Sequence, residues 1–286
     1  MFSHVAYPTP VHISEQILRI FFATRDSSQR GAVGFIDVNP QDPTQILRVS
    51  EHTVIQPGEK GDFDQDGISP GNICKVEGGL RLYYLGWSLR EGGSFSNTIG
   101  AARSDDRMGS KFVREVNQPV LGKSLLDTYS LSYPFVILPS DQTRRWRMYY
   151  GSYRNRSAGG ESMPHILAEA ISLDGVSWKA TGEELLPLTK DEQAHSRPWV
   201  WKHKGETYLF FSIKKQHYKI GVAKFDAAQS QWVRITDDVL GKSDHLFDDN
   251  ASCYASLISA GNSHWMFYNG NDYGKTGLGL AEIIIR

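Results

Sequence analysis

Leu82-Tyr83-Tyr84-Leu85-Gly86 is an apolar, aromatic run with four counterparts elsewhere in the chain of 286 residues. The counterparts are Ile20-Phe21-Phe22-Ala23-Thr24, Met148-Tyr149-Tyr150-Gly151-Ser152, Leu209-Phe210-Phe211-Ser212 and Met266-Phe267-Tyr268-Asn269-Gly270. They recur at intervals of roughly 60 residues, and a fixed period of this size is typical of repeat architectures. The sequence therefore predicts one structural unit used five times.

Each run has the neighbours expected of a multi-stranded unit. A strand of small and branched residues follows it, as in Ile99-Gly100-Ala101-Ala102, and small residues let neighbouring sheets approach face to face. A fourth strand follows in four units, whereas the last unit ends at Arg286 without one. The strand before each run often opens with proline, as in Tyr133-Pro134, where proline removes no ladder hydrogen bond.

Five sheets of about four strands arranged radially form a five-bladed β-propeller, which buries its aromatic faces between blades. Aromatic residues make up 12% of the chain, and long helical periodicity is almost absent, so the predicted class is all-β. We expect a single domain over residues 1–286. Its blades are predicted at approximately residues 1–58, 63–123, 127–188, 193–242 and 248–286. A segment near the N-terminus supplies the outer strand of the fifth blade, or that strand is absent.

Composition narrows the range of partners. The formal net charge is -1, with no basic stripe and no acidic tail, so nucleic acid and anionic membranes are not expected partners. No leader-like pattern opens the chain and no apolar run approaches a membrane span, which predicts a cytoplasmic protein. Cys74 and Cys253 lie in apolar strand-like runs and are predicted to be small buried residues. Neither a metal site nor a cofactor is predicted.

The propeller pattern also predicts where a site lies. First strands line the central channel and second strands run antiparallel to them, so the starts of first strands meet the ends of second strands. Polar residues gather at both places. Those before first strands are Asp64, Asp66, Asp127, Tyr133, Glu192, His195, Arg197, Asp248, Asp249 and Asn250. Those at second-strand ends are Arg25, Asp26, Trp87, Tyr153, Arg154, Lys214, Asn271, Asp272 and Lys275.

Several carboxylates around an aromatic-lined funnel suit carbohydrate chemistry, because glycoside cleavage commonly uses one carboxylic acid and a second carboxylate as base or nucleophile. We predict Asp64 as base or nucleophile, Glu192 as general acid and Asp127 as the group that orients or tunes them. Plainer interpretations stand beside these: Asp66-Gly67 suits a tight turn, and His195 suits a structural histidine.

The other funnel residues are predicted to bind the substrate. Arg197 at a channel-lining strand start needs a carboxylate or a ligand as partner. Aromatic faces such as Trp87, Tyr133 and Tyr254 are expected to stack on sugar rings. The predicted substrate-binding set is Arg25, Asp26, Asp66, Trp87, Tyr133, His195, Arg197, Asp249, Asn250, Tyr254, Asn271 and Lys275.

Several runs resemble a known group. They are Phe21 to Asp26, Phe63-Asp64 through Pro70, Arg197-Pro198, Cys253-Tyr254 and Asn269-Gly270-Asn271-Asp272-Tyr273-Gly274-Lys275-Thr276-Gly277. The chain resembles the glycosidase-related five-bladed propeller proteins often found with bacterial surface-polysaccharide genes. More distantly, it is similar to the arabinanase, invertase and levansucrase superfamily. The resemblance covers nearly the whole chain and implies a five-bladed fold and a carbohydrate substrate or ligand.

The chain departs from the resemblance at the acids. In the invertase and arabinanase relatives, the catalytic carboxylates sit immediately around the first-strand prolines, where this chain has Tyr7, Ser69, Tyr133 and Arg197. The closer group implies a glutamate shortly before Cys253-Tyr254, where this chain has Asn250.

Three functions therefore stay open. The leading hypothesis is a glycoside hydrolase-like protein that acts on a carbohydrate in the central funnel by carboxylate acid/base catalysis. The second is a non-catalytic carbohydrate-binding propeller. The third is a phosphate-dependent glycan-transfer enzyme, in which Arg25, Arg197 and Lys275 hold a phosphate.

Overall fold

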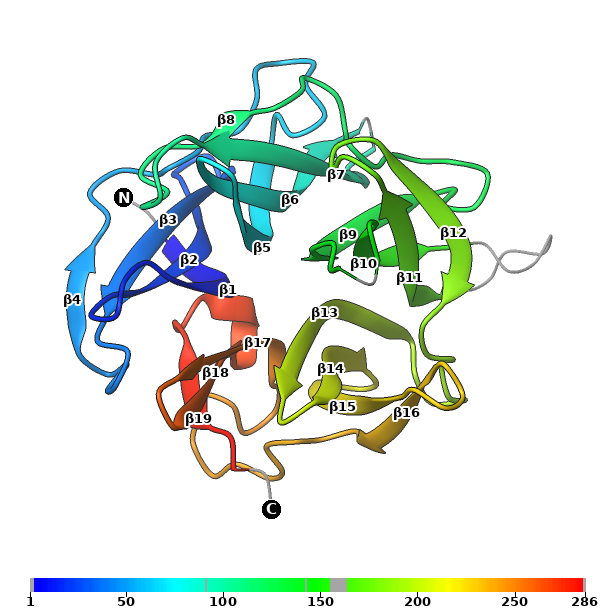
Figure 1. Ribbon diagram of the computed structural model, residues 1–286. Helices are drawn as coiled ribbons and strands as arrows, with labels where there is room; N and C mark the ends of the chain where they lie inside the picture. Colours follow the sequence, from blue (N-terminus) through cyan, green and yellow to red (C-terminus); the bar gives the residue numbers. More distant parts are fainter. Residues whose placement is uncertain (1–2, 91, 142, 155–163, 285–286) are drawn as a thin grey trace.

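The computed structural model describes residues 3–90, 92–141, 143–154 and 164–284, and its strands are arranged in a ring (Figure 1). The prediction of an all-β protein is confirmed, because the described residues form β1 to β19 and one short 3₁₀ segment, η1 (Asn271–Gly274). Over these same residues, no helix is both long and apolar enough to cross a membrane.

Consecutive strands pair antiparallel into five meanders. The first meander contains β1 (Ser3–His12), β2 (Leu18–Arg25), β3 (Gly31–Val38) and β4 (Ile46–Val49). The second contains β5 (Gly67–Val76), β6 (Gly79–Leu89), β7 (Phe95–Ser104) and β8 (Val113–Arg114). The third contains β9 (Ser130–Ile137), β10 (Trp146–Tyr153), β11 (His165–Ser172) and β12 (Trp178–Glu184). The fourth contains β13 (Ala194–His203), β14 (Glu206–Lys214), β15 (Tyr218–Asp226) and β16 (Gln231–Thr236). The fifth contains β17 (Cys253–Ala260), β18 (Ser263–Asn269) and β19 (Gly279–Glu282).

Single parallel pairs link some of the meanders. Gly31 pairs with Gly67, and His165 pairs with Ala194, so the first four meanders form two eight-stranded sheets while the fifth stands alone as a three-stranded sheet. The first strand of each meander lies toward the middle of the ring (Figure 1). Since β1 is the inner strand of the first meander, it does not supply the outer strand of the fifth.

The repeated aromatic runs pack against the repeated small residues. Tyr84 pairs with Gly100 across β6 and β7, and Tyr268 pairs with Gly279 across β18 and β19. A Cβ atom added to Gly100 would lie 2.2 Å from Tyr84 Cζ, and one added to Gly279 would lie 2.4 Å from Tyr268 Cζ. The small residue of each unit therefore makes room for the ring on the neighbouring strand, in addition to allowing sheets to approach.

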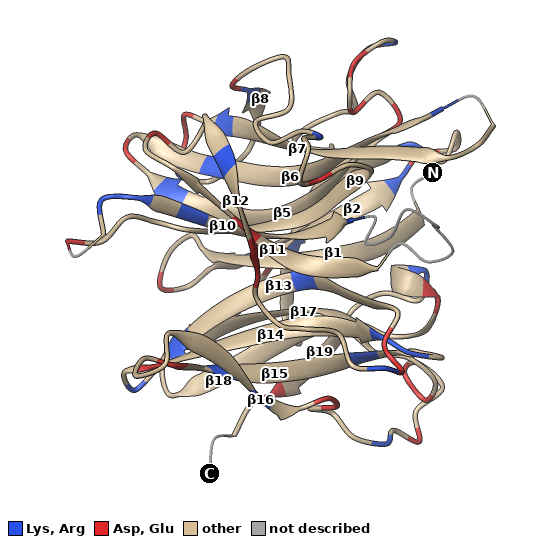
Figure 2. Ribbon diagram, turned by 90° about the vertical axis from the view of Figure 1, so that its right-hand side faces the viewer, with Lys and Arg blue, Asp and Glu red and all other residues tan. Residues whose placement is uncertain are grey.

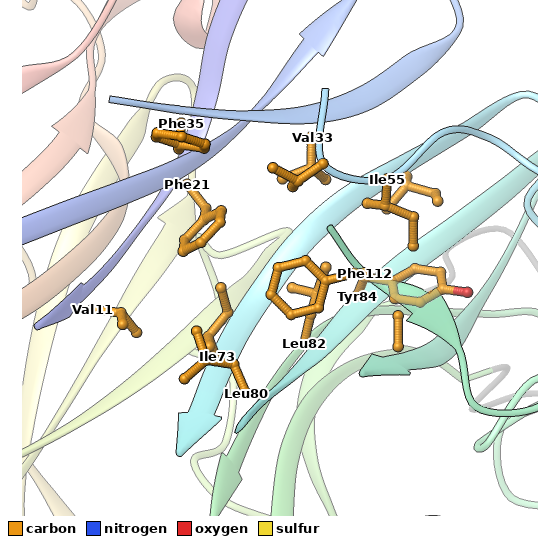
Figure 3. Close-up of a cluster of buried hydrophobic side chains, with 13 residues drawn as sticks. Val11, Phe21, Val33, Phe35, Ile55, Ile73, Leu80, Leu82, Tyr84 and Phe112 are labelled. Carbon is orange, nitrogen blue, oxygen red and sulfur yellow. The ribbon is translucent and has the colours of Figure 1, made fainter. Parts of the chain in front are cut away.

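Apolar burial is divided among the junctions between meanders. Figure 3 shows the junction of the first two, where Phe21 and Phe35 face Ile73 and Leu82. Separate clusters fill the other junctions, including the one between the fifth meander and the first, where Leu18 and Ile20 contact the group that contains Phe267. Lys, Arg, Asp and Glu lie mainly in loops and at strand ends (Figure 2). Each meander thus buries its faces only against its neighbours.

A side chain joins the last meander to the first. Asn269, at the end of β18, is fully buried. Its Oδ1 accepts a hydrogen bond from the Tyr7 N–H at 2.9 Å, and its Nδ2 donates to the carbonyls of Val5 at 2.8 Å and Gly277 at 3.0 Å. Because Val5 and Tyr7 belong to β1, this amide connects the two ends of the ring.

Replacing Asn269 with alanine is expected to lower the free energy of unfolding by about 2–4 kcal/mol, since buried backbone groups of β1 lose their partner. Urea unfolding followed by far-UV circular dichroism measures the change. The control is Asn250→Ala. Among the described residues, the exposed Asn250 side chain bonds only to Asp249, and its loss is expected to cost less than about 0.5 kcal/mol. Equal stability of the two variants would show that the amide does not hold the ring closed.

Candidate functional site

Bulges near the starts of the inner strands aim four side chains at the middle of the ring. Tyr7, Tyr133, Arg197 and Tyr254 have φ values of 58°, 44°, 48° and 61°, and the strand register shifts at each of them. Such left-handed values are uncommon outside glycine, and bulges of this kind often re-aim a side chain. Tyr7, Tyr133 and Arg197 directly precede first-strand prolines, whereas Tyr254 precedes Ala255.

The three tyrosines form one cluster. The ring centroids of Tyr7 and Tyr133 are 5.0 Å apart, those of Tyr7 and Tyr254 4.6 Å, and those of Tyr133 and Tyr254 5.5 Å. The Tyr133 hydroxyl donates to the Tyr7 hydroxyl at 3.1 Å. Burial raises the pKa of all three, so their hydroxyls are protonated at neutral pH and serve as hydrogen-bond donors.

Arg197 lies beneath this cluster and does not reach a ligand site. Its guanidinium is 1% exposed, donates to the carbonyls of Pro70 at 2.6 Å and Pro8 at 2.7 Å, and lies 5.7 Å from the Tyr7 ring centroid. Burial lowers the pKa of Arg197 to about 10, which still leaves it charged at neutral pH. The prediction of a carboxylate or ligand partner is therefore corrected, because backbone carbonyls of β1 and β5 take that role.

A pocket of 560 Å³ opens above the tyrosines. It lies where starts of inner strands and ends of second strands meet, which is the place that the propeller pattern predicts. Four predicted substrate-binding residues line it: Arg25, Asp66, Trp87 and Tyr133. Several polar and aromatic lining residues were not in the predicted set, among them His4, Tyr7, Arg30, Asn97, Asp272 and Tyr273. The volume is in the range of small-molecule sites.

The rim of the pocket includes a strained turn. Within η1, Asp272 and Tyr273 both take left-handed dihedral angles, with φ values of 59° and 54°. Asn271 holds the turn: its backbone N–H donates to the Phe247 carbonyl at 2.7 Å, and its side-chain Oδ1 accepts from the Ala251 N–H at 2.9 Å. Consecutive non-glycine residues in this region cost about 1–3 kcal/mol each, and strain of this kind clusters at ligand sites. The segment Asn269 to Gly277, which carries part of the family resemblance, contains this turn, but the sequence did not show which of its side chains face a pocket.

Asp64 is fully buried in an anchor for the loop before β5. Its Oδ2 accepts hydrogen bonds from the Tyr84 hydroxyl at 3.0 Å and from Arg114 Nε at 2.9 Å. Tyr84 is the ring that covers Gly100, so one aromatic side chain packs against its neighbouring strand and also binds the loop acid. Asp64 is not among the residues that line the pocket.

A tyrosine hydroxyl binds the acid in the same way at Asp127 and Asp248, whereas Glu192 is held by Arg234 and His195. Asp127 accepts from the Tyr150 hydroxyl at 2.7 Å and from Ser152 Oγ at 2.6 Å, and Asp248 accepts from the Tyr268 hydroxyl at 2.7 Å. We call Asp64, Asp127, Glu192 and Asp248 the anchor acids. Their repetition at equivalent places favours a structural role over the catalytic role predicted for three of them.

The charge state of Glu192 also bears on its predicted role as general acid. Its Oε1 accepts from Arg234 at 2.6 Å and its Oε2 from His195 at 2.9 Å. Burial raises the pKa of Glu192, but hydrogen bonds from Arg234 and the Thr189 N–H outweigh it and hold that pKa at about 2. A carboxyl group that is ionised throughout the neutral range has no proton to donate, which argues against the predicted general-acid role.

The remaining predicted residues lie around the pocket or below it. Asp26 caps the turn between β2 and β3 and pairs with Arg30 at 3.1 Å. Asp249 accepts from Asn250 at 2.8 Å and from Asn271 at 2.7 Å, outside the pocket lining. Cys74 and Cys253 are buried and unpaired, as predicted. Among the described residues, no three His, Cys, Asp or Glu side chains are placed to hold a metal ion.

His165 and His195 are predicted to destabilise the protein in acid. Both are buried, and burial lowers the pKa of each to about 4 from an ordinary value of 6.5. The stability from keeping them neutral is complete above pH 6.5 and is lost as the pH falls from 6.5 to 4, by up to about 1.4 kcal/mol per pH unit for each histidine. Urea unfolding across this range measures the slope. His165→Gln should reduce the slope and leave the part that comes from His195. Replacement of the exposed His217 by glutamine should leave the slope unchanged.

Comparisons with known proteins agree with this architecture. No protein-family model matches the chain. Uncharacterized protein Rv1502 of Mycobacterium tuberculosis is 32% identical over 283 residues, which cover 98% of this chain and 93% of that protein.

Solved structures share the fold at much lower identity. A glycoside hydrolase has a TM-score of 0.78 and 12% identity, with 99% of this chain and 88% of that chain covered. The alpha-L-arabinofuranosidase from Lactobacillus brevis has a TM-score of 0.75 and 12% identity, with 99% and 91% covered. A thermostable family-43 glycoside hydrolase has a TM-score of 0.69 and 15% identity, with 100% and 91% covered. The chain therefore has a glycosidase-related propeller fold and belongs to the family of the Mycobacterium tuberculosis protein Rv1502.

Proposed function

We propose that this protein binds a carbohydrate in the pocket above the tyrosine cluster, and that its five meanders are the five blades of one propeller domain. The observation that carries the proposal is the composition of the pocket. Aromatic faces of Tyr7, Trp87, Tyr133 and Tyr273 share it with polar groups such as Asn97. Aromatic rings that stack on sugar rings, together with a few placed hydrogen-bonding groups, are what a saccharide site requires.

The fold comparisons support the choice of ligand class. The solved structures of similar fold are described as a glycoside hydrolase, an arabinofuranosidase and a family-43 glycoside hydrolase, all of them named for glycosides. We carry over the ligand class and leave the activity open, because the identities are 12–15%.

Two observations favour binding over hydrolysis by the predicted acids. The inner-strand positions at which the resemblance implies catalytic carboxylates hold Tyr7, Tyr133 and Arg197, which form the tyrosine cluster and the cation beneath it. Asp64 and Glu192 are buried in anchors that do not line the pocket. Phosphate-dependent transfer also loses one of its three proposed phosphate ligands, because Arg197 is bound to backbone carbonyls.

Hydrolysis remains a second candidate function through a different pair of acids. Asp66 and Asp272 both line the pocket, and they come from different meanders. Asp66 Oδ2 accepts hydrogen bonds from the Leu89 N–H at 2.7 Å and from Gln65 Nε2 at 3.1 Å, which fix its position. Two carboxylates on separate walls of one pocket are the minimum that glycoside cleavage by acid/base catalysis uses.

Tyr273→Ala is expected to weaken glycan binding about tenfold, because the side chain is 47% exposed on the rim and available for stacking. Titration calorimetry against oligosaccharides that give a hit on a glycan array measures the change. Tyr129→Ala is the matched control, since Tyr129 is 38% exposed outside the pocket. Absence of any glycan ligand for the unaltered protein would refute the proposed function, and equal losses in both variants would refute the assignment to this pocket.

A second experiment tests which of the carboxylates, if any, takes part in catalysis. Release of sugar from aryl glycosides and from the bound oligosaccharides is measured for Asp66→Asn, Asp272→Asn and Asp64→Asn. If the protein binds carbohydrate without cleaving it, neither the unaltered protein nor any of the variants releases sugar. Asp64→Asn is expected to lower the free energy of unfolding by about 1–3 kcal/mol, because the Tyr84 and Arg114 contacts weaken, and to leave glycan affinity unchanged. Turnover that disappears in Asp64→Asn while the fold is retained would restore the catalytic prediction.

A further inference from the structure

The centre of the ring carries a positive charge that no acid neutralises. Arg197 is charged and almost fully buried, and its neighbours are the tyrosines, Cys253 and backbone carbonyls. Among the described residues, no carboxylate lies within ion-pair distance of Arg197. Burying a charge without a partner is costly, and the cost falls when a negative charge comes near. Tyr7, which lies over the guanidinium, is also part of the pocket lining.

A second unpaired cation stands in the wall of the same pocket. Arg25 ends β2 and lines the pocket, and its guanidinium makes no hydrogen bond or ion pair within the part of the chain that the structure describes. The positive charge of Arg25 also acts on Tyr7 at the pocket floor. It lowers the pKa of Tyr7, although burial has the larger effect and raises that pKa. It also acts on His4 together with Lys275: burial and these two cations lower the pKa of His4. Several cations therefore act on the space that a ligand would occupy.

The acids near the pocket do not pair with Arg25. Asp26 is paired with Arg30, so that pair contributes little net charge. Asp66 and Asp272 also line the pocket and bring negative charge to it, with Asp66 held by donors from Gln65 and Leu89. Neither of them lies within ion-pair distance of Arg25. Among the described residues Arg25 thus has no acidic partner, and a ligand is the group that can provide one.

We propose that the saccharide bound in this pocket is acidic, with a carboxylate or phosphate group that pairs with Arg25 and receives a hydrogen bond from the Tyr7 hydroxyl, which accepts from Tyr133 and keeps its own proton to donate. This inference rests on the proposed function, because it names the class of carbohydrate that the same pocket takes. Guanidinium groups bind carboxylates and phosphates through two parallel hydrogen bonds, and protonated tyrosine hydroxyls donate further ones. The charge of Arg197 beneath the floor stabilises the same anion through the tyrosine layer.

The experiment compares matched ligands by titration calorimetry at low and high salt. The probes are oligosaccharides that contain glucuronate or galacturonate, the same oligosaccharides after reduction of their carboxyl groups, glucose 6-phosphate, and inorganic phosphate. We expect the acidic oligosaccharides or the sugar phosphate to bind at least about tenfold more tightly than the carboxyl-reduced forms, with the difference shrinking at high salt. Tighter binding of the uronates identifies a carboxylate, and tighter binding of glucose 6-phosphate identifies a phosphate.

Two charge-matched variants locate the anion. Arg25→Gln should remove the preference for the acidic ligand while leaving affinity for carboxyl-reduced ligands within about twofold. Arg48→Gln removes the same charge from an exposed position on the outer strand β4 and should change neither affinity. Retention of the full preference in Arg25→Gln would overturn the role of Arg25.

The outcomes separate this inference from the proposed function. Equal binding of acidic and carboxyl-reduced oligosaccharides overturns the acidic ligand and leaves carbohydrate binding standing. If inorganic phosphate binds as tightly as glucose 6-phosphate and no oligosaccharide binds, the proposal that the ligand is a saccharide is overturned. Absence of binding by every probe and by a neutral glycan array overturns both.

Discussion

A single four-stranded meander cannot bury both of its faces, and the whole molecule depends on that constraint. Each face is covered only by the next meander, so the chain becomes stable when the last face meets the first. The Phe21 and Leu18 clusters are two of these contacts. The last meander and the first are not joined by strand pairing, and the Asn269 amide hydrogen-bonds to the backbone of β1 instead. Closure thus combines side-chain hydrogen bonds, which also include those from His12 to the Ser259 carbonyl and from Trp265 to the Pro40 carbonyl, with one apolar cluster.

Regular units provide the scaffold, and departures from regularity provide the site. The anchor acids and the rings of Tyr84 and Tyr150 repeat from meander to meander, and they lie away from the pocket. The pocket, by contrast, combines recurring tyrosines, Tyr7 and Tyr133, with residues that occur once, such as Trp87 and Asp272. A carboxylate that recurs at an equivalent place in several units and does not line the pocket is therefore better explained by the architecture than by chemistry. A unique one deserves more weight as a ligand contact.

The repeat was predictable because its signal is local: an aromatic run, a small residue opposite it and a turn appear in every unit. The position of the pocket was predictable for the same reason, since strand order fixes which ends meet. The roles of individual side chains were not. Asp64 and Asp66 are two residues apart in sequence, yet one is sealed in an anchor and the other lines the pocket. The distinction depends on Arg114, which lies 50 residues away and has no local signature.

The tyrosine cluster also decides how a ligand can enter. Tyr7, Tyr133 and Tyr254 meet above Arg197 at the middle of the ring, so the pocket is a dead end and not a tunnel through the ring. A polymer cannot be threaded from one face to the other. Under the proposed function, the part of a carbohydrate that enters the pocket must leave by the opening through which it arrived.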